Sequence, residues 1–151
     1  YGATGGRLYA SGRAGERFCV RNSGAEVVVE GCGSNGCEYM TGGIAVILGA
    51  IGDNFGAGMT GGLAFLYDEA GVAEERLNLA TLVTAPVTPS HWESVLRGLI
   101  EAHTAETRSA RAAELLRNWP EARARFLQVC PREMLARLAH PLSDAEAIPA
   151  E

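Results

Sequence analysis

Two glycine-rich motifs are the residues of this 151-residue sequence whose spacing most resembles a ligand site. Residues 31–36 and 56–61 both match G-x-G-x-x-G, the pattern with which dinucleotide-binding folds hold a pyrophosphate. The motif binds phosphate only where it opens a helix, because the helix N-terminus supplies the amide groups. Further glycine pairs at 42–43 and 61–62 break any helix there. We therefore interpret both motifs as punctuation between repeated units rather than as a nucleotide site.

The cysteines and histidines are spaced too loosely for a metal site. Cys32 and Cys37 are separated by four residues, and no second pair or histidine lies nearby in the sequence, whereas a zinc site needs four such ligands. His91 and His103 fall in a helical pattern, about 18 Å apart along the helix axis. We expect buried thiols and imidazoles that pack or cap helices, and we predict no catalytic, cofactor-binding or metal-binding residue in this chain.

Composition disfavours several classes of protein. The net charge is −5, and all 13 basic residues are arginine, whereas a general nucleic-acid binder needs a basic face. No apolar run approaches the ~18 residues of a membrane helix, and no signal peptide is recognisable at the start. Four cysteines in a chain of this length do not make a disulfide framework. We expect a reduced, cytoplasmic protein that contacts neither membrane nor nucleic acid.

A hydroxyl residue, one or two glycines and a short apolar run recur together four times. The copies begin at Thr4, Ser23, Thr41 and Thr60, at spacings of 19, 18 and 19 residues. Short apolar runs between glycines indicate strands, and a strand that returns at a fixed period without an intervening helix indicates a solenoid. We predict a parallel β-helix in which each copy forms one coil, with coils ~4.8 Å apart like hydrogen-bonded strands.

The repeat register extends beyond the strands. Cys19 and Cys37 occupy equivalent positions, with Gly56 in the third coil, and Asn35 is equivalent to Asn54. We expect a small buried residue at the first position and an asparagine ladder at the second. Alternate strand residues must face the interior, and the sequence leaves open which set does so. One set is Leu8, Val27, Val29, Ala45, Ile47, Ala64 and Leu66, and the opposite set includes Tyr9, Val28, Val46 and Phe65.

Composition also divides the chain. Residues 1–68 hold 17 of the 19 glycines and no proline, and they form the predicted β-helix. Residues 69–89 are predicted to be a linker with one last extended segment. Residues 90–140 are predicted to be a helical tail, and residues 141–151 a frayed terminus.

Within the tail, local signals predict the individual helices. Ser90 and Glu93 form a capping-box pattern at the start of the first helix. The second helix is predicted over 109–117, a third short helix from Pro120 through Phe126, and a fourth over 132–138.

Several segments together resemble the glycine-repeat (GXGXG-type) C-terminal domain of the glutamate synthase large (alpha) subunit. They are YGATGG at 1–6, GERF at 15–18, VRNSGA at 20–25, GCEYMTGG at 36–43 and NFGAGMTGG at 54–62. A looser similarity continues through the tail, around His91, His103 and residues 118–120.

The resemblance implies a right-handed parallel β-helix followed by helices. Glutamate synthase makes two glutamates from glutamine and 2-oxoglutarate, with reducing equivalents from NAD(P)H or ferredoxin. In that family an amidotransferase domain releases ammonia from glutamine, and a separate synthase domain carries FMN and a 3Fe–4S cluster. The resemblance therefore implies a non-catalytic scaffold without a cofactor of its own, partnered by those two domains or subunits.

The sequence begins inside a repeat at Tyr1, whereas the family domain has further coils upstream. We expect either a fragment or a separate subunit, whose open solenoid end meets a partner or a second copy. Two alternatives stay open, namely a β-helix subunit of another oxidoreductase, as in formylmethanofuran dehydrogenase, and a stand-alone β-helix enzyme. Residues 1–68 contain no histidine and only six acidic residues, which disfavours the enzyme.

Overall fold

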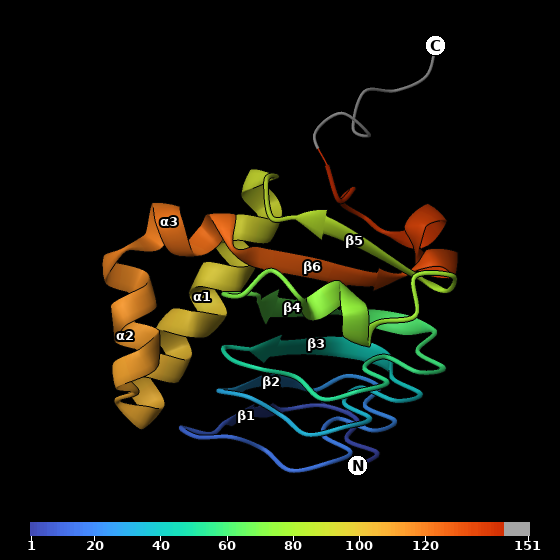
Figure 1. The fold of residues 1–151 in the computed structure, drawn as a ribbon, viewed down its shortest axis with the longest axis horizontal. Coiled ribbons are helices and arrows are strands. Elements are labelled where there is room, and N and C mark those ends of the chain that lie inside the picture. The colour runs from blue at the N-terminus through green and yellow to red at the C-terminus, as the bar shows by residue number, and fades with distance from the viewer. Residues whose placement is uncertain (144–151) are drawn as a thin grey trace.

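Four short parallel strands stack in sequence order in the structure, a computed structural model that describes residues 1–143 (Figure 1). The strands are β1 (Arg7–Tyr9), β2 (Glu26–Val29), β3 (Thr41–Ile47) and β4 (Gly61–Tyr67). Leu8 pairs with Val27, Val27 with Ala45, and Ala45 with Ala64, which reproduces the spacings of 19, 18 and 19 residues. The predicted solenoid and its register are confirmed.

Two further strands extend the sheet beyond β4. Strand β5 (Leu82–Pro86) is the extended segment predicted in the linker, and β6 (Phe126–Pro131) comes from the tail. The strand order is β1-β2-β3-β4-β6-β5, and β6 runs antiparallel to both of its neighbours. The solenoid therefore ends at β4, because the next strand in the sheet runs the opposite way.

Three α-helices gather on one side of the sheet (Figure 1). They are α1 (Ser90–Thr107), α2 (Ala110–Arg117) and α3 (Trp119–Ala124), and two 3₁₀ helices, η1 (Ala73–Arg76) and η2 (Arg132–Arg137), flank the strands. No helix among residues 1–143 is long and apolar enough to cross a membrane.

Side-chain alternation along the strands builds two separate cores. Val27, Ala45 and Ala64 point into the solenoid interior, where they meet Cys37 and Phe55 from the turns. The opposite set lies beneath the helices. This helix-covered face contains Val28, Val46, Phe65, Trp92, Leu96 and Ile100. The structure thus shows which strand residues face the interior and which face the helices, and the chain itself buries both faces of β2, β3 and β4.

The recurring Thr-Gly-Gly phrase is explained by how closely successive coils approach. A Cβ at Gly42 would clash with the Ser23 carbonyl oxygen, and one at Gly61 would clash with that of Thr41. The second glycine has a positive φ, 84° at Gly43 and 78° at Gly62, where a side chain is disfavoured. The first glycine of each pair is therefore required because a Cβ would not fit, and the second because its positive φ disfavours any other residue.

The turns that precede the strands repeat an unusual backbone conformation. Positive φ values occur at Arg17, Cys19 and Arg21 in one coil and at equivalent residues in the next two coils. Those equivalents are Asn35, Cys37 and Tyr39, then Asn54, Gly56 and Gly58. This alignment confirms the predicted equivalence of Cys19 with Cys37 and of Asn35 with Asn54. Asparagine suits the position because it tolerates left-handed conformations better than most residues.

The predicted helical tail of residues 90–140 also contains a strand, at 126–131, that the sequence did not predict. The predicted third helix ends at Ala124, and Phe126 begins β6 instead of closing the helix. The six residues from Phe126 to Pro131 are too few for periodicity to distinguish a buried strand from a helical turn. Pairing with β4 and β5 on both sides decides in favour of the strand.

Two smaller expectations about the tail also change. Pro89 is the N-cap residue of α1 and no side chain caps it, so the capping box expected from Ser90 and Glu93 is wrong. The terminus predicted to fray from 141 onward is held at its start, because Leu142 is buried and the Pro141 carbonyl accepts from Trp92 Nε1 at 2.9 Å. The remaining residues of that prediction, 144–151, lie outside the described residues.

The close approach of the coils predicts the effect of a methyl group at Gly61. Gly61→Ala should lower the free energy of unfolding by at least about 2 kcal/mol, because the backbone oxygen of Thr41 cannot rotate away. Urea unfolding measures the loss. Gly5→Ala is the matched control, because a Cβ at this equivalent position meets nothing within 4 Å. It should change stability by no more than about 0.5 kcal/mol, and equal losses in the two variants would contradict the explanation.

Strand β6 carries a buried polar residue whose replacement should stabilise the fold. Gln128 has no exposed surface, and neither its amide nitrogen nor its oxygen finds a partner among residues 1–143. Gln128→Met should raise the free energy of unfolding by about 1 kcal/mol, because it removes an unsatisfied amide at similar volume. Gln128→Glu should lower it, since a carboxylate cannot be solvated there. A methionine variant less stable than the parent in thermal unfolding would refute this account.

Candidate functional site

Neither G-x-G-x-x-G motif opens a helix. Residues 31–36 lead through a turn toward β3, residues 56–61 lead directly into β4, and the first α-helix begins only at Ser90. The motif glycines instead allow close packing, since a Cβ at Gly36 would lie 2.9 Å from the Phe55 ring. Both motifs therefore lie in the turns between successive strands, as the interpretation as punctuation between coils predicts.

The cysteines are free thiols, and three of them are buried. Burial raises the pKa of both Cys32 and Cys130 to about 11. A hydrogen bond to Cys19, together with burial, raises the pKa of Cys37 well above its usual value. Thiolates are the nucleophilic and metal-binding form of cysteine, so these three side chains are poor candidates for either task.

The described residues contain no cluster of converging metal ligands. A 3Fe–4S cluster needs converging thiolates, and within residues 1–143 no three His, Cys, Asp or Glu side chains are placed to hold a metal ion. The N-terminus of α2 is capped within the chain, because the hydroxyl of Ser109 accepts from the Ala112 amide.

The most polar buried cluster joins the helices to the solenoid. His103, on α1, is completely buried, and its Nε2 lies 3.1 Å from Oε2 of Glu30 at the end of β2. Ser109 donates to the same carboxylate oxygen at 2.6 Å. His103 Nδ1 and the Tyr9 hydroxyl are also buried and have no partner within the described part of the chain. The rings of Tyr9 and His103 lie 6.1 Å apart.

The electrostatics of this Glu30 cluster favour the carboxylate form. Burial would raise the pKa of Glu30, but hydrogen bonds from Ser109 and His103 outweigh it and lower the pKa below 4.5. The hydroxyl of Ser109 donates to the carboxylate rather than to the imidazole, so it is not activated as a nucleophile. The cluster fixes the α1–α2 turn to β2, and its geometry indicates a structural role.

The sequence predicted only half of this cluster. The expectation that His103 packs inside the fold agrees with its burial, but its partner Glu30 was not foreseen. A signal was available, because Glu30 follows Val28 with the same strand parity and must therefore face the helices.

His91 lies in a different environment from His103. It stacks on His140 with ring centroids 3.5 Å apart, and it meets Trp92 in a T-shaped arrangement with ring centroids 4.6 Å apart. Partial burial and the charge of His140 lower the pKa of His91. The structure does not bring His91 and His103 together, so the prediction that they cannot share a metal is supported by their separate partners.

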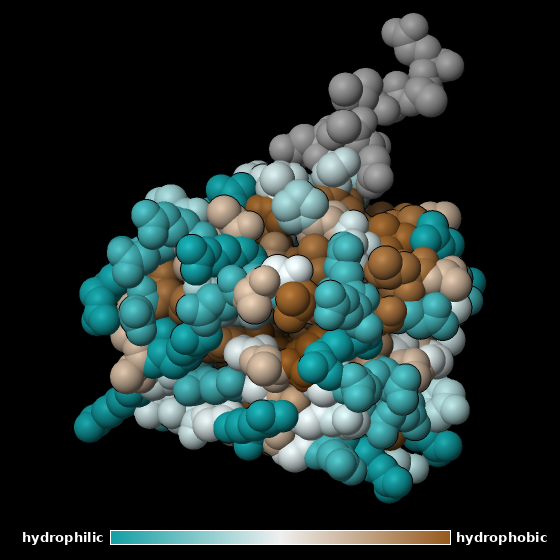
Figure 2. Space-filling model, viewed as in Figure 1, coloured by the Kyte–Doolittle hydropathy of each residue, from teal (hydrophilic) through white to brown (hydrophobic). Residues whose placement is uncertain are grey.

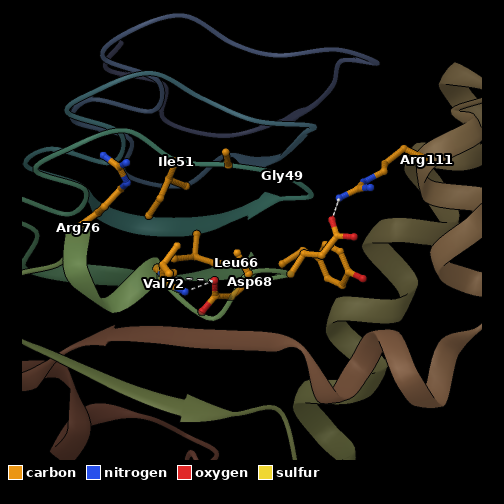
Figure 3. Close-up of a pocket in the computed structure, with 12 residues that line it drawn as sticks. Gly49, Ile51, Leu66, Asp68, Val72, Arg76 and Arg111 are labelled. Atoms are coloured by element: carbon orange, nitrogen blue, oxygen red, sulfur yellow. Dashed lines mark hydrogen bonds and ion pairs between the residues drawn. The ribbon is translucent and has the colours of Figure 1, made fainter.

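A pocket of about 260 Å³ opens where β3 and β4 end. Figure 3 shows Arg76 and Arg111 at opposite ends of it, with Ile51, Leu66 and Val72 between them. Its charged groups already have partners. Arg111 donates to the Leu48 carbonyl and to Glu69, Arg76 pairs with Asp53, and Asp68 accepts from the amides of Val72 and Ala73. The pocket therefore suits an apolar side chain better than a charged ligand.

A larger hollow of about 470 Å³ lies at the β1 end of the solenoid, hereafter the open end. Interior residues Val27 and Val29 line it, together with Phe18, Cys19 and Leu8, and Leu8 is 52% exposed. Leu82 and Val129 fill the interior at the other end. The open end is thus an apolar recess that the described residues leave partly uncovered.

Replacing the Glu30 carboxylate tests the Glu30 cluster. The pKa of Glu30 is lower in the folded state than its ordinary value of 4.5. The charged carboxylate therefore stabilises the folded state fully at pH values above 4.5, and this stabilisation is lost as the pH falls through the lower folded-state pKa. Glu30→Gln should cost about 1–3 kcal/mol near neutral pH, and the difference from the parent should shrink in acid.

Urea unfolding over a pH series measures the effect of Glu30→Gln. The control is Glu26→Gln on the same strand, whose carboxylate is more exposed and lies 3.9 Å from Arg7. It should change stability by less than about 1 kcal/mol at any pH. A loss in Glu30→Gln that is independent of pH would show that the carboxylate charge is not what stabilises the turn.

Comparisons with known proteins agree with the resemblance. A family model described as the GXGXG motif matches residues 1–132. The chain is 56% identical over 151 residues to the glutamate synthase (NADPH) large chain of Azospirillum brasilense. It is 50% identical over 131 residues to ferredoxin-dependent glutamate synthase 2 of Synechocystis sp., and 47% identical over 146 residues to the glutamate synthase (NADH) of Schizosaccharomyces pombe.

These alignments cover 100%, 87% and 97% of this chain but only 10%, 8% and 7% of the three relatives. The chain thus spans about a tenth of the length of the proteins that it matches. With the family model matching most of its residues, the chain belongs to the GXGXG-motif family and corresponds to a region of glutamate synthase large chains.

Proposed function

We propose that this chain is a non-catalytic scaffold domain of a glutamate synthase, the enzyme that forms two glutamates from glutamine, 2-oxoglutarate and a reductant. The observation that carries the proposal is that the chain buries both faces of β2, β3 and β4 with its own apolar side chains. The half-buried carboxylate of Glu30 is already hydrogen-bonded within the chain, to His103 and Ser109. In this proposal the role of the fold is packing, and the FMN and 3Fe–4S groups belong to other domains.

The surface supports a packing role. Figure 2 shows hydrophobic residues gathered at the centre of the visible face and at its upper right, where η2 and the segment before β5 lie. The exposed large hydrophobic residues include Val72, Leu79 and Leu135. Together with the open end, these surfaces can contact the amidotransferase and synthase domains or subunits.

A stand-alone β-helix enzyme is less well supported by the geometry. Such an enzyme needs a titratable cluster that substrate can reach. The histidine–carboxylate pair of the Glu30 cluster is shielded, with the His103 side chain fully buried and that of Glu30 17% exposed. Electron donor and oligomeric state are properties of the whole enzyme, and the relatives include NADPH, NADH and ferredoxin types.

The scaffold proposal predicts what the purified chain lacks. It should show no flavin absorbance after incubation with FMN and desalting, bind no iron, and release no ammonia from glutamine. Absorbance spectroscopy, iron analysis and an ammonia assay check the three expectations, with circular dichroism establishing that the chain is folded. A complete glutamate synthase large chain assayed in parallel is the positive control. Stoichiometric flavin or glutamine hydrolysis by the folded chain would overturn the proposal.

A further inference from the structure

The segment that follows η2 lies against the first turn of α1. Residues 138–143, at the end of the red chain in Figure 1, lie outside the range 1–132 that the family model matches. Leu142 is buried in the core of the helix-covered face, Leu138 packs against that core, and the Pro141 carbonyl accepts from Trp92 Nε1 at 2.9 Å. The 138–143 segment therefore helps to bury Trp92, which is 7% exposed.

Two imidazole rings join this segment to the helix. His91, in the first turn of α1, and His140 are stacked with ring centroids 3.5 Å apart and an angle of 16° between the rings. Trp92 meets both rings edge-on, at centroid distances of 4.6 and 6.3 Å. Two uncharged rings attract each other at such a distance, and one cation over a neutral ring is also favourable. Two imidazolium ions repel, by about fivefold in an equilibrium constant at ~4 Å even in bulk water.

The acidic side chain of α1 next to this stack is already paired. Glu93 accepts from Trp119 Nε1 at 3.1 Å through Oε1, and its Oε2 lies 3.0 Å from a guanidinium nitrogen of Arg123 on α3. The strands beneath, β4 and β6, carry no acidic or basic side chain, and the pKa of the Cys130 thiol is raised by burial to about 11, so that thiol is neutral.

The remaining charges near the stack belong to η2. Glu133 and Arg137 are both exposed, and within residues 1–143 the one histidine that pairs with a carboxylate is His103, in the Glu30 cluster. Partial burial and the charge of His140 lower the pKa of His91, which agrees with a stack that has no paired anion. The described residues therefore leave a second positive charge in the stack without compensation.

We propose that His91 and His140 form a pH switch, which holds the 138–143 segment over Trp92 while at most one imidazole is charged and releases the segment when both are charged. Release breaks the stack and the hydrogen bond from Trp92 to Pro141, and it exposes the Trp92 ring and the Leu142 side chain. The inference does not depend on the scaffold function, because it concerns how this chain closes over its own core.

The direction of the pH dependence follows from the protons that each form binds. In the released form the two imidazoles titrate as exposed histidines do, near pH ~6.5, whereas the stack resists the second proton. The released form thus binds more protons in acid, so the closed form loses stability as the pH falls below about 6.5 and regains it on neutralisation. The segment should be closed at a pH of about 7.5 and increasingly released toward a pH of about 5.

Hydroxyl-radical labelling of Trp92 measures the release. The protein, in its complete form, is labelled at pH values from about 7.5 to about 5, digested with trypsin and analysed by mass spectrometry, and a reporter peptide corrects for the radical dose at each pH. Trp92 falls on peptide 77–97 and Trp119 on peptide 118–123. Trp119 is the internal control for global unfolding, because it is 6% exposed and its indole donates to Glu93 rather than to the 138–143 segment.

A shielded residue is labelled in proportion to the population of the form that exposes it. We therefore expect the labelling of Trp92 to rise about fivefold or more between the neutral and the acidic end of the series, and to return to its first value after neutralisation. The labelling of Trp119 should stay constant throughout.

Two variants distinguish repulsion between the imidazoles from other effects of acid. His140→Phe keeps a flat ring against His91 but removes one titrating group, and His91→Gln removes the other. At most one charge can then form in the contact, so the labelling of Trp92 should not change with pH in either variant, even where the loss of stacking raises its value at neutral pH. Constant labelling of Trp92 in the parent, the same pH response in the variants, or a parallel rise at Trp119 would each overturn the proposal.

Discussion

The close approach of successive backbone turns is the constraint on which this structure depends. Coils that are hydrogen-bonded to one another leave no space for a Cβ at Gly42 or Gly61, and they impose a positive φ on the glycines that follow. The glycine-rich composition of the repeat region is therefore a consequence of stacking. A G-x-G-x-x-G motif that opens a helix binds a pyrophosphate. In this fold the motif at residues 56–61 precedes a strand, and its last glycine, Gly61, packs against the neighbouring coil.

Stacking also determines how the rest of the chain must fold. A solenoid buries one face of its strands in its own interior, and the other face, with Val28, Val46 and Phe65, would be left to water. Helix α1 covers that face with Leu96 and Ile100, and the Glu30 cluster fixes the far end of the helix to β2. Successive strand residues point to opposite faces, so one alternate set fills the solenoid interior and the other packs against the helices.

The repeat region could be predicted from the sequence because its order is local and periodic. Four copies kept one register, so strand positions, coil equivalences and the position of the turns followed without knowledge of tertiary contacts. Strand β6 could not be predicted in this way, since Phe126–Pro131 occurs once and its conformation is decided by pairing with β4 and β5. The contact between His103 and Glu30 spans 73 residues, and it depends on how a helix lies across the sheet. The helical spacing of apolar residues predicted which face of α1 is buried, but it could not predict that Glu30 is the partner of His103 on that face.

One end of the solenoid is determined by a change of strand direction. Antiparallel β6 pairs with β4, and Leu82 and Val129 complete the interior there, so no further parallel coil can pair with β4 on that side. Within the coils, burial raises the pKa of Cys32, which keeps its thiol protonated. An interior cysteine therefore serves the fold as a small apolar side chain, in the same way that the glycines serve it by leaving space for the neighbouring coil.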